Sequence, residues 1–214
     1  TCALPISNGI KDVGDTLLPG WRIRLSGSVN DSLFTTTNGT FQFTGIRAGT
    51  YTLREALQNG WVQSYPTPVP PGTFTITITS GSVITDKYFG NFQLGKVTGV
   101  IFNDINGNSQ QDNNEPRISN WKLYLISATR TDSIFTNNNG AFTFDNVYPG
   151  DYTVREELQS EWIKTFPISN IYEVTLKSGD IITGNTFCNF KLGKIFGTKF
   201  NDVNGNGNKD LGET

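Results

Sequence analysis

The feature that most constrains the fold of this chain is an internal repeat. The segment at 95–104 returns at 193–202, and the segment at 51–55 returns at 152–156. These two spacings, 98 and 101 residues, are so close that they indicate short loop insertions within one repeating unit. A unit of about 98 residues is too long for a solenoid repeat and has the size of an independent domain. The sequence therefore predicts three parts: a first repeat at 1–94 that is truncated at its N-terminus, a complete repeat at 95–192, and the first strand and loop of a third repeat at 193–214.

Within each unit, apolar and polar side chains alternate over short stretches. This pattern is clear at 74–78, 121–125 and 172–176, and it is typical of strands with one buried face. No stretch has the spacing of an amphipathic helix. Turn signals separate the alternating stretches, at Asn38-Gly39, Ser80-Gly81, Asn139-Gly140, Pro149-Gly150 and Ser178-Gly179. We therefore expect an all-β fold of tandem antiparallel β-sandwich domains, standing end to end with little linker.

Composition excludes several classes of function. The 214 residues contain no histidine, so the commonest general base and the commonest transition-metal ligand are absent. A net charge of −2 provides no basic surface of the kind that binds nucleic acid or anionic lipid. No apolar run is long enough to span a bilayer, and no Ser, Cys or Lys stands in a nucleophile motif. We expect a structural protein without enzymatic activity, nucleic-acid partner or membrane insertion, and the absence of Met suggests a fragment of a longer chain.

One loop in the second repeat, and its copy in the third, have the spacing of calcium ligands. With the first Asp as position 1, side-chain oxygens fall at positions 1, 3, 5, 9 and 12, as in an EF-hand loop whose seventh position contributes a backbone carbonyl. Each loop contains three carboxylates, which predicts weak binding of about 10⁻⁵–10⁻³ M and a structural calcium ion. The alternative is that Asn, Gly and Asp are ordinary turn residues. The candidate ligands are Asp104, Asn106, Asn108, Gln110, Asp112 and Glu115, and Asp202, Asn204, Asn206, Asn208, Asp210 and Glu213.

The loops differ from one another at two places. Position 6 is Gly207 in the third repeat but Ser109 in the second, where a sharp turn imposes some conformational cost on a residue with a side chain. In the first repeat, positions 1 and 3 are Leu4 and Ile6, so we expect no calcium site there. The expected flanking elements are strands rather than helices, which makes these EF-hand-like loops without the EF-hand frame.

These motifs resemble the B-type repeats of Gram-positive surface adhesins, most closely the B domains of serine-aspartate repeat proteins within the collagen-adhesin B-type group. The resemblance covers the chain from about residue 8 to its end. It implies prealbumin- or immunoglobulin-like sandwiches in a secreted or cell-wall protein, forming a calcium-stiffened stalk whose partners are neighbouring repeats. The motifs that carry it are Phe-Asn-Asp-x-Asn-Gly-Asn…Asp…Glu at 102–115 and 200–213, Tyr-Thr-Val-Arg-Glu at 152–156, and Phe-x-Asn-Phe-x-Leu-Gly at 89–95 and 187–193.

Some members of that wider group carry an intramolecular Lys–Asn isopeptide bond promoted by a buried acid. Glu156 is in line with core residues of its strand, and Asn189 lies in the last strand of the repeat. Lys199 of the third repeat is replaced by Ile101 in the second, so we expect no isopeptide bond within 95–192. The simpler interpretation is that Glu156 is an acid at the end of a sheet, paired with a neighbouring Arg or with backbone donors.

Three functions remain open. The sequence favours a rigid spacer, in which an ion close to the short joints between domains restricts bending. The alternatives are a module that binds carbohydrate or a host protein, and an accessory domain of a larger secreted enzyme. Exposed tryptophans would favour sugar binding, but their register with the core strands predicts packing, and Cys188 is predicted to be a small buried residue. The tryptophans form one pair per repeat: Trp21 with Trp61, and Trp121 with Trp162.

Overall fold

A computed structural model describes residues 11, 12, 14–67 and 72–214 of the chain. The described part contains strands and no helix, as the alternating pattern predicts, and therefore no helix that could cross a membrane. The first repeat contributes β1 (Arg22–Ser26), β2 (Asp31–Phe34), β3 (Gly49–Glu55), β4 (Trp61–Tyr65), β5 (Phe74–Ile78) and β6 (Gly90–Gln93). The second contributes β7 (Gly95–Asn103), β8 (Lys122–Ile126), β9 (Thr131–Phe135), β10 (Ala141–Val147), β11 (Gly150–Glu156), β12 (Trp162–Phe166), β13 (Ile171–Leu176) and β14 (Ile181–Lys191).

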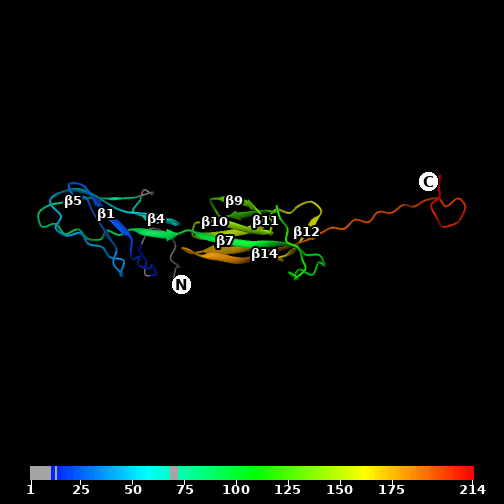
Figure 1. The fold of residues 1–214 in the computed structure, drawn as a ribbon, viewed down its shortest axis with the longest axis horizontal. Coiled ribbons are helices and arrows are strands. Elements are labelled where there is room, and N and C mark those ends of the chain that lie inside the picture. Colours follow the sequence, from blue (N-terminus) through cyan, green and yellow to red (C-terminus); the bar gives the residue numbers. More distant parts are fainter. Residues whose placement is uncertain (1–10, 13, 68–71) are drawn as a thin grey trace.

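The second repeat is a sandwich of two four-stranded sheets (Figure 1). One sheet has the strand order β10-β7-β14-β12 and the other β13-β11-β8-β9. Apolar residues that alternate along the strands fill the space between the sheets, which is how a half-buried strand stabilises a sandwich. The core consists of Val97, Ile101, Trp121, Leu123, Leu125, Phe142, Phe144, Val147, Val154, Leu176 and Phe187. The predicted all-β sandwich is confirmed.

One pairing departs from the antiparallel prediction. β14 runs parallel to β7, from Ile181 opposite Lys96 to Asn189 opposite Asn103, whereas the other strand pairs are antiparallel. The reason is that β7 and β14 are the first and last strands of the repeat. Both run from the end where the chain enters to the end where it leaves, so parallel pairing allows domains to follow one another head to tail.

The first repeat has the same pairing in its larger sheet. The strand order is β2-β1-β3-β5, which corresponds to β9-β8-β11-β13 of the second repeat, and β4 pairs with β6 as β12 pairs with β14. Its buried core is smaller and comprises Ile23, Leu25, Tyr51 and Leu53. The positions of Leu4 and Ile6, where we expect no calcium site, lie outside the described residues.

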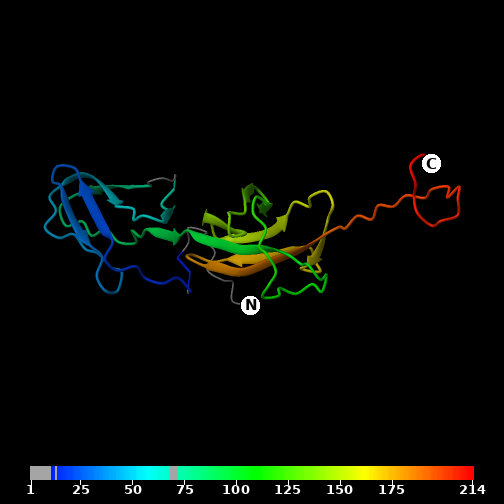
Figure 2. The ribbon, with the colours of Figure 1, turned by 45° about the vertical axis from the view of Figure 1, so that its right-hand side comes forward.

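The joint between the two repeats is short, and its residues contact the second repeat. A single residue separates β6 from β7, and the repeats follow one another along the long axis (Figures 1 and 2). The ring of Phe92 packs against Tyr148 with centroids 5.2 Å apart. The backbone N–H of Gln93 donates to Ser178 Oγ at 2.8 Å, and Gly179 N–H donates to the Gln93 carbonyl at 2.9 Å. This joint is therefore a packed interface rather than a free linker.

Residues 193–214 leave the end of β14 and form no strand, although the sequence predicts the first strand of a third repeat there (Figure 2). The segment repeats the sequence of β7 but has no neighbouring strand to pair with. Ile195 and Phe196, which correspond to positions 97 and 98 of β7, are accordingly exposed. Strand formation here depends on pairing rather than on local sequence.

Candidate metal centre

The loop at 104–115 begins where β7 ends. Asp104 is fully buried, and its backbone N–H donates to the Asn189 carbonyl of β14 at 2.9 Å. The far end of the loop is fixed as well, because the N–H of Asn103 donates to the Pro116 carbonyl at 2.9 Å. The parallel pair β7–β14 thus provides a rigid base on which the loop closes.

The Asp104 carboxylate is held by amides of its own loop. Oδ1 accepts from Asn108 N–H at 3.0 Å, and Oδ2 accepts from Ser109 N–H at 2.9 Å. Burial acts to raise the pKa of Asp104, but the hydrogen bonds outweigh burial and hold the pKa below its ordinary value. Asp104 is therefore a carboxylate anion at neutral pH, buried in a site that contains no cationic side chain.

The other two carboxylates of the loop are also anchored. One oxygen of Asp112 accepts from Asn106 Nδ2 at 2.8 Å and from Asn108 Nδ2 at 2.9 Å. Glu115 Oε1 accepts from Ile105 N–H at 2.9 Å, and Oε2 accepts from Asp112 N–H at 3.1 Å. The loop thus collects negative charge and pairs it with N–H dipoles rather than with cationic side chains.

The loop of the third repeat has the same network 98 residues later. Asn206 N–H and Gly207 N–H donate to the two oxygens of Asp202 at 3.1 and 2.7 Å. The carboxamides of Asn204 and Asn206 donate to one oxygen of Asp210, both at 2.7 Å, and these bonds lower the pKa of Asp210. Glu213 accepts from the backbone amides of residues 203 and 210 at 3.0 and 2.9 Å. No sandwich surrounds this loop, so its own sequence suffices to organise it.

The remaining predicted ligands and the sixth position follow the same pattern in both loops. Gln110 N–H donates to Asn108 Oδ1 at 2.8 Å, and Asn208 N–H donates to Asn206 Oδ1 at 2.7 Å. The backbone φ is 63° at Ser109 and 75° at the corresponding glycine, 207. Ser109 therefore adopts the left-handed conformation that the sequence predicts to be costly for a residue with a side chain.

Carboxylates alone do not form a metal site in either loop. Throughout residues 11–12, 14–67 and 72–214, no three side chains of His, Cys, Asp or Glu come together as a metal-binding group. A cation bound here would also need oxygens from the Asn carboxamides and the backbone. Such all-oxygen sets suit hard cations such as Ca²⁺.

A second polar feature, which sequence reasoning identified only in part, lies inside each sandwich. Asn189 Nδ2 donates to Glu156 Oε2 at 2.7 Å, and Asn91 Nδ2 donates to Glu55 Oε2 at 2.8 Å. Period-2 alternation placed Glu156 on the core side, but the partner is a carboxamide rather than an Arg or backbone donors. Burial raises the pKa of both glutamates to about 7, and the Asn hydrogen bond offsets part of this rise.

The surroundings of Glu156 bear on the isopeptide question. Ile101 is fully buried opposite Phe187 of β14. The Lys164 amino group reaches this region and donates to the Glu156 backbone carbonyl at 3.4 Å. The absence of an isopeptide bond from 95–192 stays a prediction, which an intact-mass measurement tests through the loss of one ammonia.

The aromatic residues behave as packing groups. Trp21 and Trp121 are buried, and they meet Trp61 and Trp162 edge to face with centroids 5.4 and 5.3 Å apart. The predicted packing role of the two buried tryptophans is therefore confirmed. Cys188 is also buried as predicted, and burial raises the pKa of its thiol to about 11, which makes it unreactive.

Comparison with known proteins agrees with this description. The model of the SdrD B-like domain family matches residues 95–175, which make up most of the second repeat. Serine-aspartate repeat-containing protein F of Staphylococcus epidermidis is 28% identical over 70% of this chain, and protein D of Staphylococcus aureus is 29% identical over 69%. Colossin-A of Dictyostelium discoideum is 28% identical over 94% of the chain.

The chain spans only a small part of these relatives, namely 10%, 12% and 2% of their respective lengths. Among solved structures, the Bacillus anthracis TIE protein aligns with a TM-score of 0.40 and 15% identity, covering 82% of this chain and 32% of that one. The minor pilin GBS52 of Streptococcus agalactiae aligns with a TM-score of 0.37 and 12% identity, covering 89% of this chain and 91% of that one. At these TM-scores the likeness is distant.

Proposed function

We propose that the chain is a structural, calcium-binding repeat module that acts as a rigid spacer in an extracellular or cell-surface adhesin. The match of residues 95–175 to the SdrD B-like domain family supports the assignment to an adhesin and the location at the cell surface. The burial of Trp21 and Trp121 supports a structural role, because neither of these tryptophans is available as a sugar platform. The chain is not an enzyme under this proposal, which agrees with the absence of histidine and of nucleophile motifs.

The observation that carries the calcium proposal is the duplicated loop network. Two loops in different surroundings, one against a sandwich and one without, hold three carboxylates with the same backbone and carboxamide donors. In each loop, two Asn amide groups converge on one Asp oxygen and supply partial positive charge there. A divalent cation supplies more charge, and Asn side chains have an oxygen to present in place of the amide. Asp104, Asn106, Asn108, Asp112, Glu115 and the Gln110 carbonyl would hold the ion in the second repeat.

The position of the loop determines which of the two joints its ion would approach. Loop 104–115 follows the end of β7 that lies away from the joint at 92–95, so its ion would not touch that joint (Figure 1). The loop instead approaches the end of β14: a Cβ built on Gly107 lies 3.7 Å from the Phe190 ring. The ion of the second repeat would therefore stabilise the exit of the chain at 191–194.

Calorimetric titration of the 214-residue chain with CaCl₂ after chelation tests the proposal. We expect two sites with Kd in the range of about 10⁻⁵–10⁻³ M. Asp104→Asn combined with Glu115→Gln should remove one site and leave the other, and Asp202→Asn with Glu213→Gln should do the converse. No heat of binding, together with unchanged melting in calcium and in chelator, would reject calcium binding.

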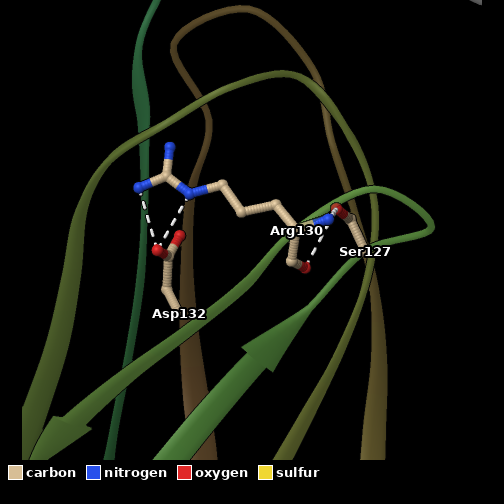
Figure 3. Close-up of polar contacts among 3 residues, drawn as sticks. All are labelled: Ser127, Arg130 and Asp132. Atoms are coloured by element: carbon tan, nitrogen blue, oxygen red, sulfur yellow. Dashed lines mark hydrogen bonds and ion pairs between the residues drawn. The ribbon is translucent and has the colours of Figure 1, made fainter.

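A matched control removes a carboxylate elsewhere. Asp132 lies in β9 just after the turn from β8, and its Oδ1 accepts from Arg130 Nε at 2.9 Å and pairs with Nη2 at 2.8 Å (Figure 3). Ser127 closes the same turn by hydrogen bonds with the Arg130 backbone (Figure 3). Because this carboxylate already has a cationic partner, Asp132→Asn should leave both calcium sites unchanged.

A further inference from the structure

Three arginines lie on the outer face of the larger sheet in the first repeat. Arg22 and Arg24 are on β1, and Arg54 is on β3, where all three alternate with buried core residues. Arg24 and Arg54 are direct cross-strand partners, which places their Cβ atoms about 5 Å apart. Arg22 is two residues along the same strand, a further ~7 Å. Like charges directly opposite each other are unfavourable unless something neutralises them.

No carboxylate of this chain neutralises the three arginines. In the part of the chain that the structure describes, none of them forms an ion pair, and the residues outside that part contain no Asp or Glu. Among the described residues, Arg22 donates only to Ser32 Oγ, at 3.1 Å from Nη2 and 3.4 Å from Nε. The Nε of Arg24 is buried without a hydrogen-bond partner. A buried guanidinium nitrogen with no acceptor is costly, so this face lacks an acceptor.

The second repeat provides an internal comparison. The N–H of Glu157 donates to the Lys122 carbonyl at 2.9 Å, just as Ala56 N–H donates to the Arg22 carbonyl at 2.8 Å, which establishes that these positions correspond. In the second repeat, Lys122 pairs with Glu157 at 3.5 Å. Tyr124 donates to Glu157 at 3.1 Å and lies under the guanidinium of Arg155, 4.2 Å from its ring centroid.

The same face therefore has one acid to balance two cations in the second repeat, and no acid to balance three cations in the first. Two differences account for this: Arg24 in the first repeat replaces Tyr124, and Ala56 replaces Glu157. The first replacement adds a charge, and the second removes the acid that would balance it. Both changes act in the same direction and within one patch, on the same strands of the same sandwich.

We propose that the face formed by Arg22, Arg24, Arg54, Ser32 and Phe34 binds a sulfated polysaccharide. Guanidinium groups match sulfate oxygens with paired N–H donors. The short spacing of the three charges fits a polymer with more than one anionic group per disaccharide, and an open sheet face suits an extended chain. Phe34 is the cross-strand partner of Arg22 and is 63% exposed, so its ring offers an apolar surface to a sugar beside the charges.

Nucleic acid fits this face less well. Proteins that bind nucleic acid through phosphates alone use an extended basic surface that neutralises many phosphates. The affinity of such binding falls steeply as the salt concentration rises. Here the basic face is confined to one patch on a chain whose net charge is −2. A short site that combines charge with a hydroxyl and an aromatic ring is better matched to a glycan segment.

Binding of the full 214-residue chain to immobilised heparin tests the proposal, in chelator so that the outcome is independent of the calcium loops. We expect saturable binding of the chain to heparin. Neutral dextran should not compete with heparin, and hyaluronan, with one carboxylate per disaccharide, should compete only weakly. Arg24→Tyr combined with Ala56→Glu transfers the arrangement of the second repeat and should weaken binding about tenfold or more. Unchanged melting would show that this variant is folded.

The converse variant supplies a gain of function. Tyr124→Arg combined with Glu157→Ala should create a second binding face on the second repeat and double the stoichiometry. Equal binding of heparin by the wild-type chain and by Arg24→Tyr/Ala56→Glu would overturn the proposal. Binding of duplex DNA or hyaluronan as tight as that of heparin would also overturn it, because it would indicate general attraction of polyanions rather than a sulfated-glycan site.

Discussion

The two buried glutamates are the residues whose chemistry the fold changes most. Alternation along β3 and β11 suffices to predict that Glu55 and Glu156 face the core. It does not identify their partners, because Asn91 and Asn189 lie on the last strand of each repeat and become neighbours only when the two sheets pack. Contacts between sheets depend on the packing angle and on bulges, which a single sequence does not encode locally.

The raised pKa values predict a stability that falls with increasing pH. In the unfolded chain each glutamate ionises near 4.5, whereas in the folded chain it keeps its proton until about pH 7. Between these values the unfolded state binds fewer protons, so the contribution is complete below pH 4.5 and is lost as pH rises through 7. The loss is at most about 3 kcal/mol per glutamate. Urea unfolding at pH 5 and pH 8 measures it.

Glu156→Gln isolates the contribution of the second repeat to this pH dependence of the free energy of unfolding. The variant has no charge to bury, so the free energy of unfolding of this repeat should vary less between pH 5 and 8 than in the wild type. Glu157→Gln, on the exposed side of the same strand end, is the matched control and should keep the wild-type dependence. A wild-type pH dependence that survives in Glu156→Gln would show that another group is responsible.

Ser109 has a left-handed backbone conformation within the second-repeat loop. Its φ of 63° is a conformation that glycine adopts freely, and the corresponding residue of the third repeat is Gly207. Ser109→Gly should therefore stabilise the loop by about 1 kcal/mol. Calcium affinity of the second-repeat site should rise while that of the third stays constant, as measured by titration. A weaker second-repeat site would mean that the serine side chain contributes to the loop in some other way.

At the scale of the elements, each repeat has a threonine that fixes the segment before one core strand, β1 in the first repeat and β8 in the second. Thr136 Oγ1 accepts from Trp121 N–H at 2.9 Å and donates to the Ile118 carbonyl at 2.8 Å. In the first repeat, Thr35 makes the same two bonds with the backbone of residues 21 and 18, at 2.9 and 2.7 Å. A hydroxyl at the end of an edge strand thus positions the buried tryptophan.

Thr136→Val tests this element. Valine has nearly the same shape but leaves the Trp121 N–H and the Ile118 carbonyl without their partner, which should cost about 1–3 kcal/mol in the free energy of unfolding. Thr136→Ser keeps the hydroxyl and should recover most of the loss. Denaturant unfolding followed by tryptophan fluorescence measures both variants. Equal stability of the valine variant and the wild type would show that water satisfies these groups.

Strands with local signals were predictable from the sequence, whereas pairings that depend on topology were not. Trp121, which directly precedes β8, alternates with Leu123 and Leu125 of that strand, and all three are buried as expected. The parallel pairing of β14 with β7 has no local signature, because it follows from the paths of the first and last strands through the domain. The bulge in this pair, where Asn185 donates to the Thr98 carbonyl at 2.8 Å, is equally invisible to alternation.

At the scale of the whole molecule, the calcium loop of the second repeat and the entry joint at 92–95 lie at opposite ends of β7. The ligand spacing of the two loops was readable from the sequence, because an EF-hand-like loop is local. The distance of the second-repeat loop from the entry joint could not be read from the sequence, because this distance depends on the direction in which β7 runs. The entry joint is instead fixed by contacts between the two repeats, namely the packing of Phe92 on Tyr148 and the hydrogen bonds of Gln93 with the turn at 178–179. Stiffness at this joint therefore has a source that requires no metal.

This separation yields a prediction about the shape of the molecule. Spin labels at exposed positions, Asn30→Cys and Thr129→Cys with Cys2→Ser, report the distance between the first and second repeats. We expect a narrow distance distribution that is the same in calcium and in chelator. Phe92→Ala combined with Ser178→Ala should broaden it, because these changes remove the ring contact with Tyr148 and the hydrogen bond from Gln93.

The matched control is Asp104→Asn with Glu115→Gln, which should leave this distribution unchanged while removing one calcium site. Calcium should narrow a distance distribution only when one of the labels lies beyond the exit at 191–194, where the loop of the second repeat approaches Phe190. If chelation alone broadened the distance between the two repeats, the metal would be acting on the entry joint through the sandwich. The rigidity of the spacer would then be a property of the bound ion rather than of the packed interface.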